Sequence, residues 1–514
     1  MRGKRKDTSG VCRGRRVLVR TFASLGLAIL AGSAAAVPVA VPVPATAQRV
    51  HDGIAAYERK DCAEADRQLR PLMQGDPNAA TLSGTQTLAF DLLISCAARA
   101  DRKEAAYADA LAGTHIGEGD DYLWRMRFFL EIETDRAEAA VATAEAMPAA
   151  QPSLLSDIDG SWFYRLDRLL KDKGQSALRE RLLKLLSSDA YKPEDGPIAK
   201  DGFRVLHARL LAGRPGGEAE ARAEVAAVRS PYWLRRASVD LALRPFLPAD
   251  IDLRAAVEAT LKADRDAATA HPDRLRPLDF AADDLLELGR PDEALRLLQS
   301  VATEVEDPKA FTDRDKNIPW WWDDVGRSDQ ALGRYDEAVA ALRHGMALSE
   351  RGAPNVSQAI NLAILQNRFG HPRDALATLA IFDDPAHKTS PFGQIVLRFA
   401  RGCAHVLLGE KGKAAPDLAY ARAHEEDSPS DLTDLLLCAG DLDGAASVLI
   451  RRLDDPEQRA DALLALSDYP DPPVRLPPPP TERGLAAVKA RPDVQAAIAR
   501  AGGTRHFNVL PSEV

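Results

Sequence analysis

The sequence predicts an all-α chain that folds as an α-solenoid of antiparallel helix pairs. A phrase recurs at residues 288–295, 332–339 and 369–376: an apolar residue and Gly, then polar residues, an acidic residue, Ala and an aliphatic residue. Weaker copies surround Gly409 and Gly440, so that the five glycines lie 31 to 44 residues apart. Helical spacing of apolar residues is widespread, and strand-like alternation is nearly absent. Such a period is typical of solenoids, in which each unit buries its apolar face against its neighbours.

Each position of the phrase has a packing role. Gly289 suits the exit of a helix, because glycine adopts left-handed dihedrals without strain. Pro291 suits the first turn of the next helix, where its missing N–H is no loss. Ala294 is small enough to let two helices approach closely. The phrase therefore indicates helix packing rather than catalysis.

The unit that begins at Trp322 resembles the tetratricopeptide repeat. The family pattern Trp-x-x-Leu-Gly appears as Trp322-Asp323-Asp324-Val325-Gly326, and the helix turn as Gly333-Arg334-Tyr335-Asp336-Glu337-Ala338. The unit departs from the pattern at Asp329, where the family has Tyr, and at Gly345, where it has Ala. The resemblance covers roughly residues 271 to 455 and implies a superhelix that binds protein partners.

Composition shifts divide the chain into four parts. Phrases like the repeat persist in weaker form before residue 150, and the segment from Pro470 to Pro480 contains seven prolines. Such a segment cannot be an ordinary helix and should be extended. Short helices are expected after it, at 482–490 and 492–501. The predicted parts are a signal peptide (1–47), divergent helical repeats (48–270), tetratricopeptide-like repeats (271–469) and a Pro-rich linker with a helical tail (470–514).

The amino terminus has the pattern of a secretory signal. Eight basic residues precede or flank an apolar stretch at 22–37, and Ala45-Thr46-Ala47 offers small residues for cleavage. An uncleaved membrane anchor is one alternative, although prolines 38, 42 and 44 would break a long apolar helix. A twin-arginine signal at Arg15-Arg16 is another. We expect a periplasmic or secreted protein with no membrane span once the signal is removed.

Removal of the signal makes the chain strongly acidic. The net charge is −9, and the first 47 residues carry eight basic and one acidic residue, so their loss leaves −16. An acidic body argues against nucleic acid and against anionic lipid surfaces as partners.

Four cysteines remain after Cys12 leaves with the signal, and an even number in an oxidising compartment permits two disulfides. Cys62 begins one predicted helix and Cys96 lies near the end of the helix that opens the next unit, so a bridge between them is expected. A second bridge would join Cys403 and Cys438. The alternative is four buried thiols that act as small hydrophobic residues.

The sequence contains no His-Glu-x-x-His, Walker loop, Gly-x-Gly-x-x-Gly or Gly-x-Ser-x-Gly motif. No catalytic, cofactor-binding or metal-binding residue is therefore predicted, and Gly409–Lys413 is interpreted as a helix connection. In the aromatic cluster Trp320-Trp321-Trp322, we expect Trp322 to fill the repeat core, while Trp320 is open to a role in ligand binding.

The resemblance also implies a binding groove, because the first helix of each tetratricopeptide unit lines the concave face. An acidic stretch of this groove could hold a basic segment of a partner; the alternative is that these are ordinary solvated positions on acidic helices. By position, the groove residues are Asp279, Asp283, Glu287, Trp320, Asp323, Arg327, Asn361 and Arg368.

The sequence thus favours an exported, non-enzymatic scaffold that binds a protein or peptide along a solenoid groove in the bacterial cell envelope. Two alternatives remain. One is a periplasmic glycan-processing enzyme with an α-superhelical body, although no compact catalytic unit is evident after residue 455. The other is a structural subunit of an envelope or secretion assembly.

Overall fold

The computed structural model describes residues 45–74, 83–116, 120–194, 196–248, 251–350 and 353–511. The predicted signal peptide lies outside these ranges except for 45–47, which form the first turn of α1 (Ala45–Glu58). The all-α prediction is confirmed: in the described ranges, the strands are one antiparallel hairpin, β1 (Ser349–Glu350) with β2 (Ala353–Pro354). Within the same ranges, we find no helix long and apolar enough to cross a membrane.

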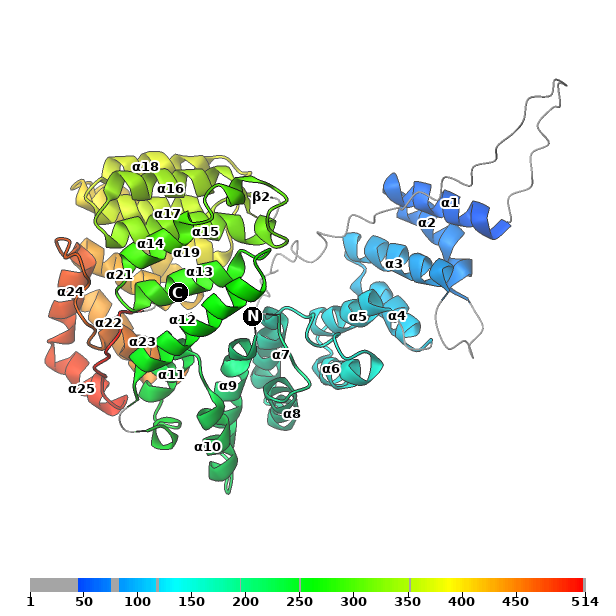
Figure 1. Ribbon diagram of the computed structural model, residues 1–514, viewed down its shortest axis with the longest axis horizontal. Helices are drawn as coiled ribbons and strands as arrows, with labels where there is room; N and C mark the ends of the chain where they lie inside the picture. Colours follow the sequence, from blue (N-terminus) through cyan, green and yellow to red (C-terminus); the bar gives the residue numbers. More distant parts are fainter. Residues whose placement is uncertain are drawn as a thin grey trace. The chain divides into compact units, whose positions relative to one another are not determined.

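The chain divides into two compact units, residues 1–203 and 204–514 (Figure 1). In the first unit, α1 is followed by α2 (Cys62–Leu69), η1 (Arg70–Met73), α3 (Gly84–Arg99), α4 (Lys103–Thr114), α5 (Asp121–Glu133), α6 (Ala137–Ala150), α7 (Gly160–Asp172), α8 (Ser176–Ser187) and η2 (Pro197–Lys200).

The second unit contains the predicted tetratricopeptide-like repeats. Its elements begin with α9 (Asp201–Ala212), which spans the boundary, and continue with α10 (Glu218–Ala227), α11 (Pro231–Val239), η3 (Arg244–Phe246), α12 (Leu253–Ala270), α13 (Arg276–Glu287), α14 (Pro291–Gln299), η4 (Glu304–Glu306), α15 (Arg314–Ala331), α16 (Tyr335–Ala347), α17 (Ser357–Arg368), α18 (Pro372–Leu379), η5 (Ala380–Asp383), α19 (Pro391–Leu407), α20 (Lys411–Ala423), η6 (Glu425–Asp427), α21 (Pro429–Ala439), α22 (Leu442–Asp454), α23 (Arg459–Leu466), α24 (Pro480–Lys489) and α25 (Pro492–Arg500).

A left-handed residue marks the turn inside each repeat. Gly289, Gly333, Gly370, Gly409 and Gly440 all have φ between +71° and +81°. The residue after each one donates its N–H to a carbonyl five residues back, as Arg290 does to Leu285 over 2.8 Å. This bond satisfies a carbonyl that the helix end would leave unpaired. The predicted role of the turn glycines is confirmed.

The first unit makes the same turn with Gly174 once and without glycine at three other positions. Lys60, Asp101 and Asp135 occupy the left-handed position, with φ of 64°, 54° and 65°. Each is followed by the same five-residue backbone hydrogen bond, for example from Arg102 N to Ala97 O over 2.8 Å. The weak phrases of the first unit are therefore turns between paired helices, as predicted.

Small residues bring the paired helices together. The alanine of each late phrase is at most 1 % exposed: Ala294, Ala338, Ala375, Ala414 and Ala445. A larger side chain at these positions would push the second helix away from the first, because protein interiors are close-packed.

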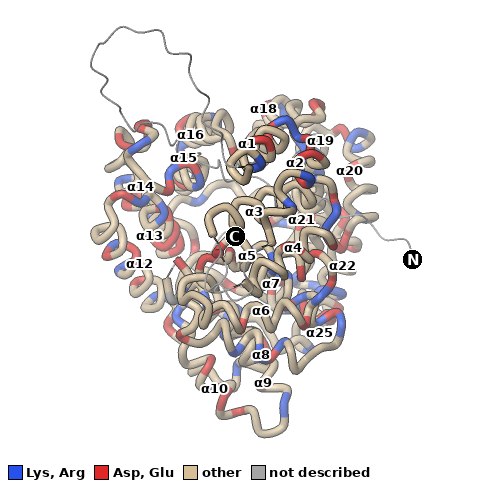
Figure 2. The backbone as a smooth tube through the Cα atoms, turned by 90° about the vertical axis from the view of Figure 1, so that its right-hand side faces the viewer, with Lys and Arg blue, Asp and Glu red and all other residues tan. Residues whose placement is uncertain are grey.

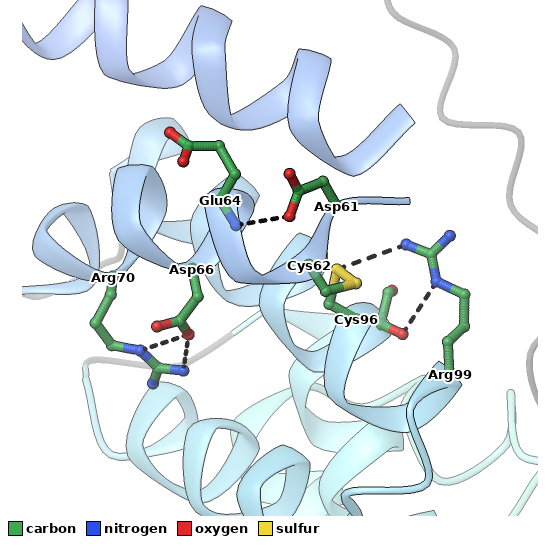
Figure 3. Close-up of a disulfide and its surroundings, with 8 residues drawn as sticks. Asp61, Cys62, Glu64, Asp66, Arg70, Cys96 and Arg99 are labelled. Atoms are coloured by element: carbon green, nitrogen blue, oxygen red, sulfur yellow. Dashed lines mark hydrogen bonds and ion pairs between the residues drawn. A yellow bond between two sulfur atoms is a disulfide. The ribbon is translucent and has the colours of Figure 1, made fainter. Parts of the chain in front are cut away.

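Two disulfides join neighbouring helix pairs. Cys62 and Cys96 are bonded with their Cα atoms 5.5 Å apart, and Cys403 and Cys438 with theirs 5.7 Å apart, both within the usual range. Figure 3 shows the first bridge, where Arg99 lies beside Cys96 and donates to the Ser95 carbonyl over 3.4 Å. Each bridge links one helix pair to the next, α2 to α3 and α19 to α21.

The carboxyl-terminal helices pack against the preceding repeats of the second unit. The predicted helices at 482–490 and 492–501 correspond to α24 and α25, which lie beside α21 and α22 (Figure 1). Residues beyond α25 continue into the same core: Phe507 is 4 % exposed and Val509 is 1 % exposed. One continuous apolar cluster runs from Val239 to Val509 and includes residues of α12, α13 and α21 to α25.

Three backbone or side-chain links close this unit across long stretches of sequence. Leu510 N donates to Glu287 O over 2.9 Å, and Arg244 donates to Gly502 O over 2.9 Å. Arg505 donates to Ser238 O over 3.0 Å. The tail therefore fastens the end of the second unit to the helices at its beginning.

Candidate partner-binding face on α13, α15 and α17

The three helices that carry the predicted groove residues are the first helices of consecutive pairs. Asp313, the residue before α15, accepts hydrogen bonds from Leu275 N over 2.8 Å and Arg276 N over 3.1 Å. It thereby satisfies two amide groups at the start of α13 that would otherwise lack acceptors. This contact fixes the position of α15 relative to α13. We call the side of these helices that carries Asp279, Asp283, Asp323, Arg327 and Asn361 the first-helix face.

The residues predicted on α13 share one side of the helix but differ in burial. Asp279, Asp283 and Glu287 are spaced by four residues, which places them above one another. Asp279 is 6 % exposed and Glu287 is 9 % exposed, whereas the Asp283 side chain is 47 % exposed. Of these three, Asp283 is the one that a partner can reach.

Polar contacts connect the first-helix face from one repeat to the next. Arg327 Nη1 lies 2.5 Å from Asp283 Oδ1 on α13 and 3.0 Å from Asp324 Oδ1 on its own helix. Asn361 on α17 donates to Asp323 Oδ1 over 2.9 Å. These contacts join four of the predicted residues in two pairs, Asp283 with Arg327 and Asp323 with Asn361. Figure 2 shows acidic residues gathered beside α13.

Two other predicted residues contact parts of the chain far from this face in sequence. Glu287 pairs with Arg235 of α11, and Arg235 is 2 % exposed. Arg368 Nη1 lies 2.5 Å from Glu482 Oε1 at the start of α24. Glu287 therefore links α13 to α11 through a buried pair, and Arg368 links α17 to α24 through a partly exposed one.

The tryptophan cluster differs from the expectation in which ring is deepest. Trp321, at 1 % exposed, lies in the core, while Trp322 is partly buried and packs against that core. Trp322 meets Trp321 edge-on at 4.8 Å and stacks on His344 at 4.0 Å. The prediction that Trp322 fills the core must therefore be corrected in favour of Trp321, because the helix turns this ring inward. Trp320 is 40 % exposed.

Burial changes the electrostatics of the first-helix face. It raises the pKa of Asp279 well above the ordinary value, and the negative charge of Asp283 raises it further. The same two causes act on Asp324, whose pKa is raised well above the ordinary value although Arg327 opposes the change. A charged carboxylate is disfavoured when it loses water and faces another carboxylate. Arg327 already lies beside Asp283, and a second cation from a partner would relieve this repulsion further.

Sequence reasoning missed a second carboxyl pair beside this face. Asp264 of α12 lies close enough to Asp284 of α13 for its negative charge to raise the pKa of Asp284. Burial raises the pKa of Asp284 to about 8 and that of Asp264 to about 6. Asp284 follows the predicted Asp283 directly, but its contact with Asp264 depends on how α12 packs, which the sequence pattern does not encode.

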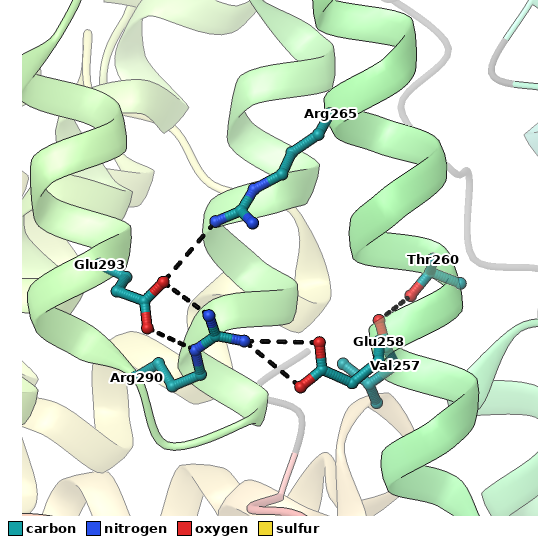
Figure 4. Close-up of polar contacts among 6 residues, drawn as sticks. All are labelled: Val257, Glu258, Thr260, Arg265, Arg290 and Glu293. Atoms are coloured by element: carbon teal, nitrogen blue, oxygen red, sulfur yellow. Dashed lines mark hydrogen bonds and ion pairs between the residues drawn. The ribbon is translucent and has the colours of Figure 1, made fainter.

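The turn after α13 is tied to α12 by charged groups (Figure 4). Arg290 Nε lies 2.6 Å from Glu293 Oε1, and Arg290 Nη1 lies 3.3 Å from Glu258 of α12. Arg265 of α12 approaches Glu293 at 3.8 Å. These partly exposed contacts steady the turn and α12 against each other, each with a small energy.

The carboxyl pair predicts a pH-dependent stability. Asp284 binds a proton more tightly in the folded chain than in the unfolded chain, where its pKa is near 3.8. Protonated Asp284 therefore makes its full contribution to the stability of the fold below pH 4. That contribution is lost as the pH rises through 8. Between pH 6 and pH 8, the free energy of unfolding of Asp284→Asn should therefore fall by about 1–2 kcal/mol less than that of the wild-type chain.

Denaturant unfolding at pH 6 and at pH 8 measures this effect. Asp266→Asn is the matched control, because Asp266 on α12 is 66 % exposed and pairs with Lys262. An unchanged pH slope in Asp284→Asn would contradict the prediction.

The described residues contain no group of three or more His, Cys, Asp or Glu side chains arranged to hold a metal ion. Gly409 lies at the turn between α19 and α20, where His405 Nδ1 is 2.9 Å from Glu410 Oε2. The interpretation of Gly409–Lys413 as a helix connection is therefore confirmed.

No protein family model matches the chain, and no curated protein matches it. Similar solved structures include the APC/C hetero-tetramer Cut9–Hcn1 (TM-score 0.29, 11 % identity, covering 89 % of this chain and 96 % of that one), Naa15/Naa10 bound to HypK-THB (0.24, 12 %, 89 % and 96 %) and yeast Tom70 (0.24, 13 %, 88 % and 99 %). At such TM-scores these similarities add nothing to the repeat geometry described above. On that geometry, the chain is an all-α solenoid of tetratricopeptide-like helix pairs.

Proposed function

We propose that this chain is an exported, non-enzymatic scaffold that binds a basic segment of a protein partner along the first-helix face. Stacked helix pairs present a long continuous surface, which suits the recognition of another polypeptide. The observation that carries the proposal is the half-exposed Asp283 beside the buried Asp279 and Asp324. A lysine or arginine of a partner would find a favourable potential there and would associate faster at low salt.

Export of the chain to the cell envelope is part of this proposal. The four cysteines in the described residues form two disulfides between neighbouring repeats, and such bonds persist in oxidising compartments. The basic and apolar pattern of residues 1–47 supports the same location.

A photo-crosslinking residue in place of Trp320 would test the binding face. Phe392 at the start of α19 is the matched control position, because it is also an exposed aromatic residue, at 57 %. With envelope extract, we expect a crosslinked partner from position 320 and not from position 392, and a weaker yield as the salt concentration rises.

A charge variant completes the experiment. Asp283→Asn should lower the crosslinking yield at position 320 at least fivefold, whereas Asp292→Asn on α14, an aspartate that is 61 % exposed, should not. Asp279 is unsuitable for this purpose because its burial would make any substitution a test of folding. Equal yields in the Asp283 and Asp292 variants would rule out this face as the binding site.

A further inference from the structure

The segment that links α23 to α24 lies along the edge of the repeats. We call residues 470–479 the proline strap; six of its ten residues are prolines. The strap has no regular secondary structure, and most of its residues are exposed. Its position is informative because it follows the turns of consecutive helix pairs.

The strap contacts two turn glycines in sequence order. A Cβ atom built on Gly289 would lie 3.7 Å from Pro473 Cγ. A Cβ atom built on Gly333 would lie 3.3 Å from Val474 Cγ1 and 3.8 Å from Leu476 Cδ2. The strap thus passes from the α13–α14 turn to the α15–α16 turn. Just beyond it, Glu482 reaches Arg368 at the end of α17.

Few directional bonds hold the strap in place. In the described ranges, residues 470–478 form no backbone–backbone hydrogen bond with the rest of the chain. Proline has no N–H to donate, so the strap relies on side-chain contacts with turns that lack a Cβ atom. A proline-rich chain is already extended before it binds and loses little entropy on docking.

We propose that the edge formed by the Gly289 and Gly333 turns is a docking track for extended, proline-rich polypeptide, and that the proline strap occupies it in this chain. The partner that fits is a protein with an extended proline-rich segment, aliphatic side chains two residues apart, as in Val474 and Leu476, and a carboxylate that reaches Arg368. Such a partner competes with the strap, whose tethering gives it an effective concentration on the order of millimolar. This track is a different surface from the first-helix face, so either proposal can fail alone.

Trypsin cleavage after Arg475 reports whether the strap is docked, because a protease needs a chain that it can draw into its active site. Arg475 has a side chain that is 71 % exposed and is followed by Leu476. The probe is a synthetic peptide of residues 469–482 with Gln in place of Arg475. At millimolar concentration it should speed cleavage of the full chain at Arg475 at least threefold, measured by mass spectrometry.

Two turn variants provide a matched pair. Gly333→Asn keeps a residue that tolerates a left-handed turn but adds a side chain against the strap. It should speed cleavage at Arg475 without peptide, whereas Gly370→Asn should not, because a Cβ atom on Gly370 meets nothing within 4 Å. Both variants have the same kind of backbone, with φ of +73° and +81°.

Each outcome decides the proposal. Faster cleavage with the proline peptide, together with no effect of a peptide whose prolines are replaced by alanine, supports a docking track. Faster cleavage in Gly333→Asn without any effect of the proline peptide would mean that the strap is a permanent clamp, and the proposal would be wrong. An equal effect of both peptides, or no effect of either peptide or variant, would also overturn it.

Discussion

Replacing Arg235 with methionine is expected to lower the free energy of unfolding of the second unit by about 3–5 kcal/mol. Arg235 pairs with Glu287, and both are at least nine-tenths buried. The guanidinium also donates to Leu510 O over 3.2 Å and lies 5.7 Å from the ring centre of Phe507. The substitution would leave Glu287 buried without its cation. Burial already raises the pKa of Glu287 even with Arg235 present.

Denaturant unfolding of Arg235→Met measures this loss. Arg491→Met is the control, because Arg491 pairs with Asp443, whose side chain is 90 % exposed, and such a pair is worth at most about 1 kcal/mol. The double variant Arg235→Met with Glu287→Leu should recover much of the stability, since it removes both charges. A loss below about 1 kcal/mol in Arg235→Met would show that this pair does not fasten the tail.

Removing the Cys62–Cys96 bridge is expected to lower the stability of the first unit by about 3–4 kcal/mol. The bridge closes a loop of sequence separation 34, and its loss would give the unfolded chain more freedom. Cys62→Ala with Cys96→Ala measures the effect in non-reducing buffer. Cys403→Ala with Cys438→Ala, across a separation of 35, should have a similar effect on the second unit.

Thiol counting and reduction check that the bridges form. In the denatured chain of residues 48–514, without reductant, we expect no free thiol. Reductant should lower the free energy of unfolding of each unit in the wild-type chain to the value found in the variant that lacks the bridge of that unit. In that variant, reductant should not change the stability of the same unit. Four free thiols in the unreduced chain would contradict both bridges.

The repeats and their turns could be predicted from the sequence because they depend on local chemistry. The left-handed turn at Gly289, the helix start at Pro291 and the small Ala294 each follow from the residue itself. The prediction of which tryptophan is most buried was wrong. Neighbouring residues of a helix point about 100° apart, and the repeat pattern did not fix whether Trp321 or Trp322 faces the core.

The contacts that depend on tertiary packing could not be predicted. Arg235 and Leu510 are 275 residues apart, and no periodic pattern links them. Asp279 and Asp323, two of the predicted groove positions, are only 6 % and 7 % exposed, and this burial depends on the helices packed around them. The pair Asp264 and Asp284 was missed for the same reason.

The closure of the second unit by its tail alters how the repeats should melt. In an open array, each repeat depends only on its neighbours, so the terminal repeats fray first and unfolding spreads inward. Here α23 packs against α11, and residues of α24, α25 and the segment after them share one core with α12 and α13, so the last described helices are held in the interior of the second unit. Its helices should therefore exchange their amide hydrogens together, as a single cooperative block. Removal of the segment after α25 should instead let the second unit unfold repeat by repeat from its carboxyl-terminal end.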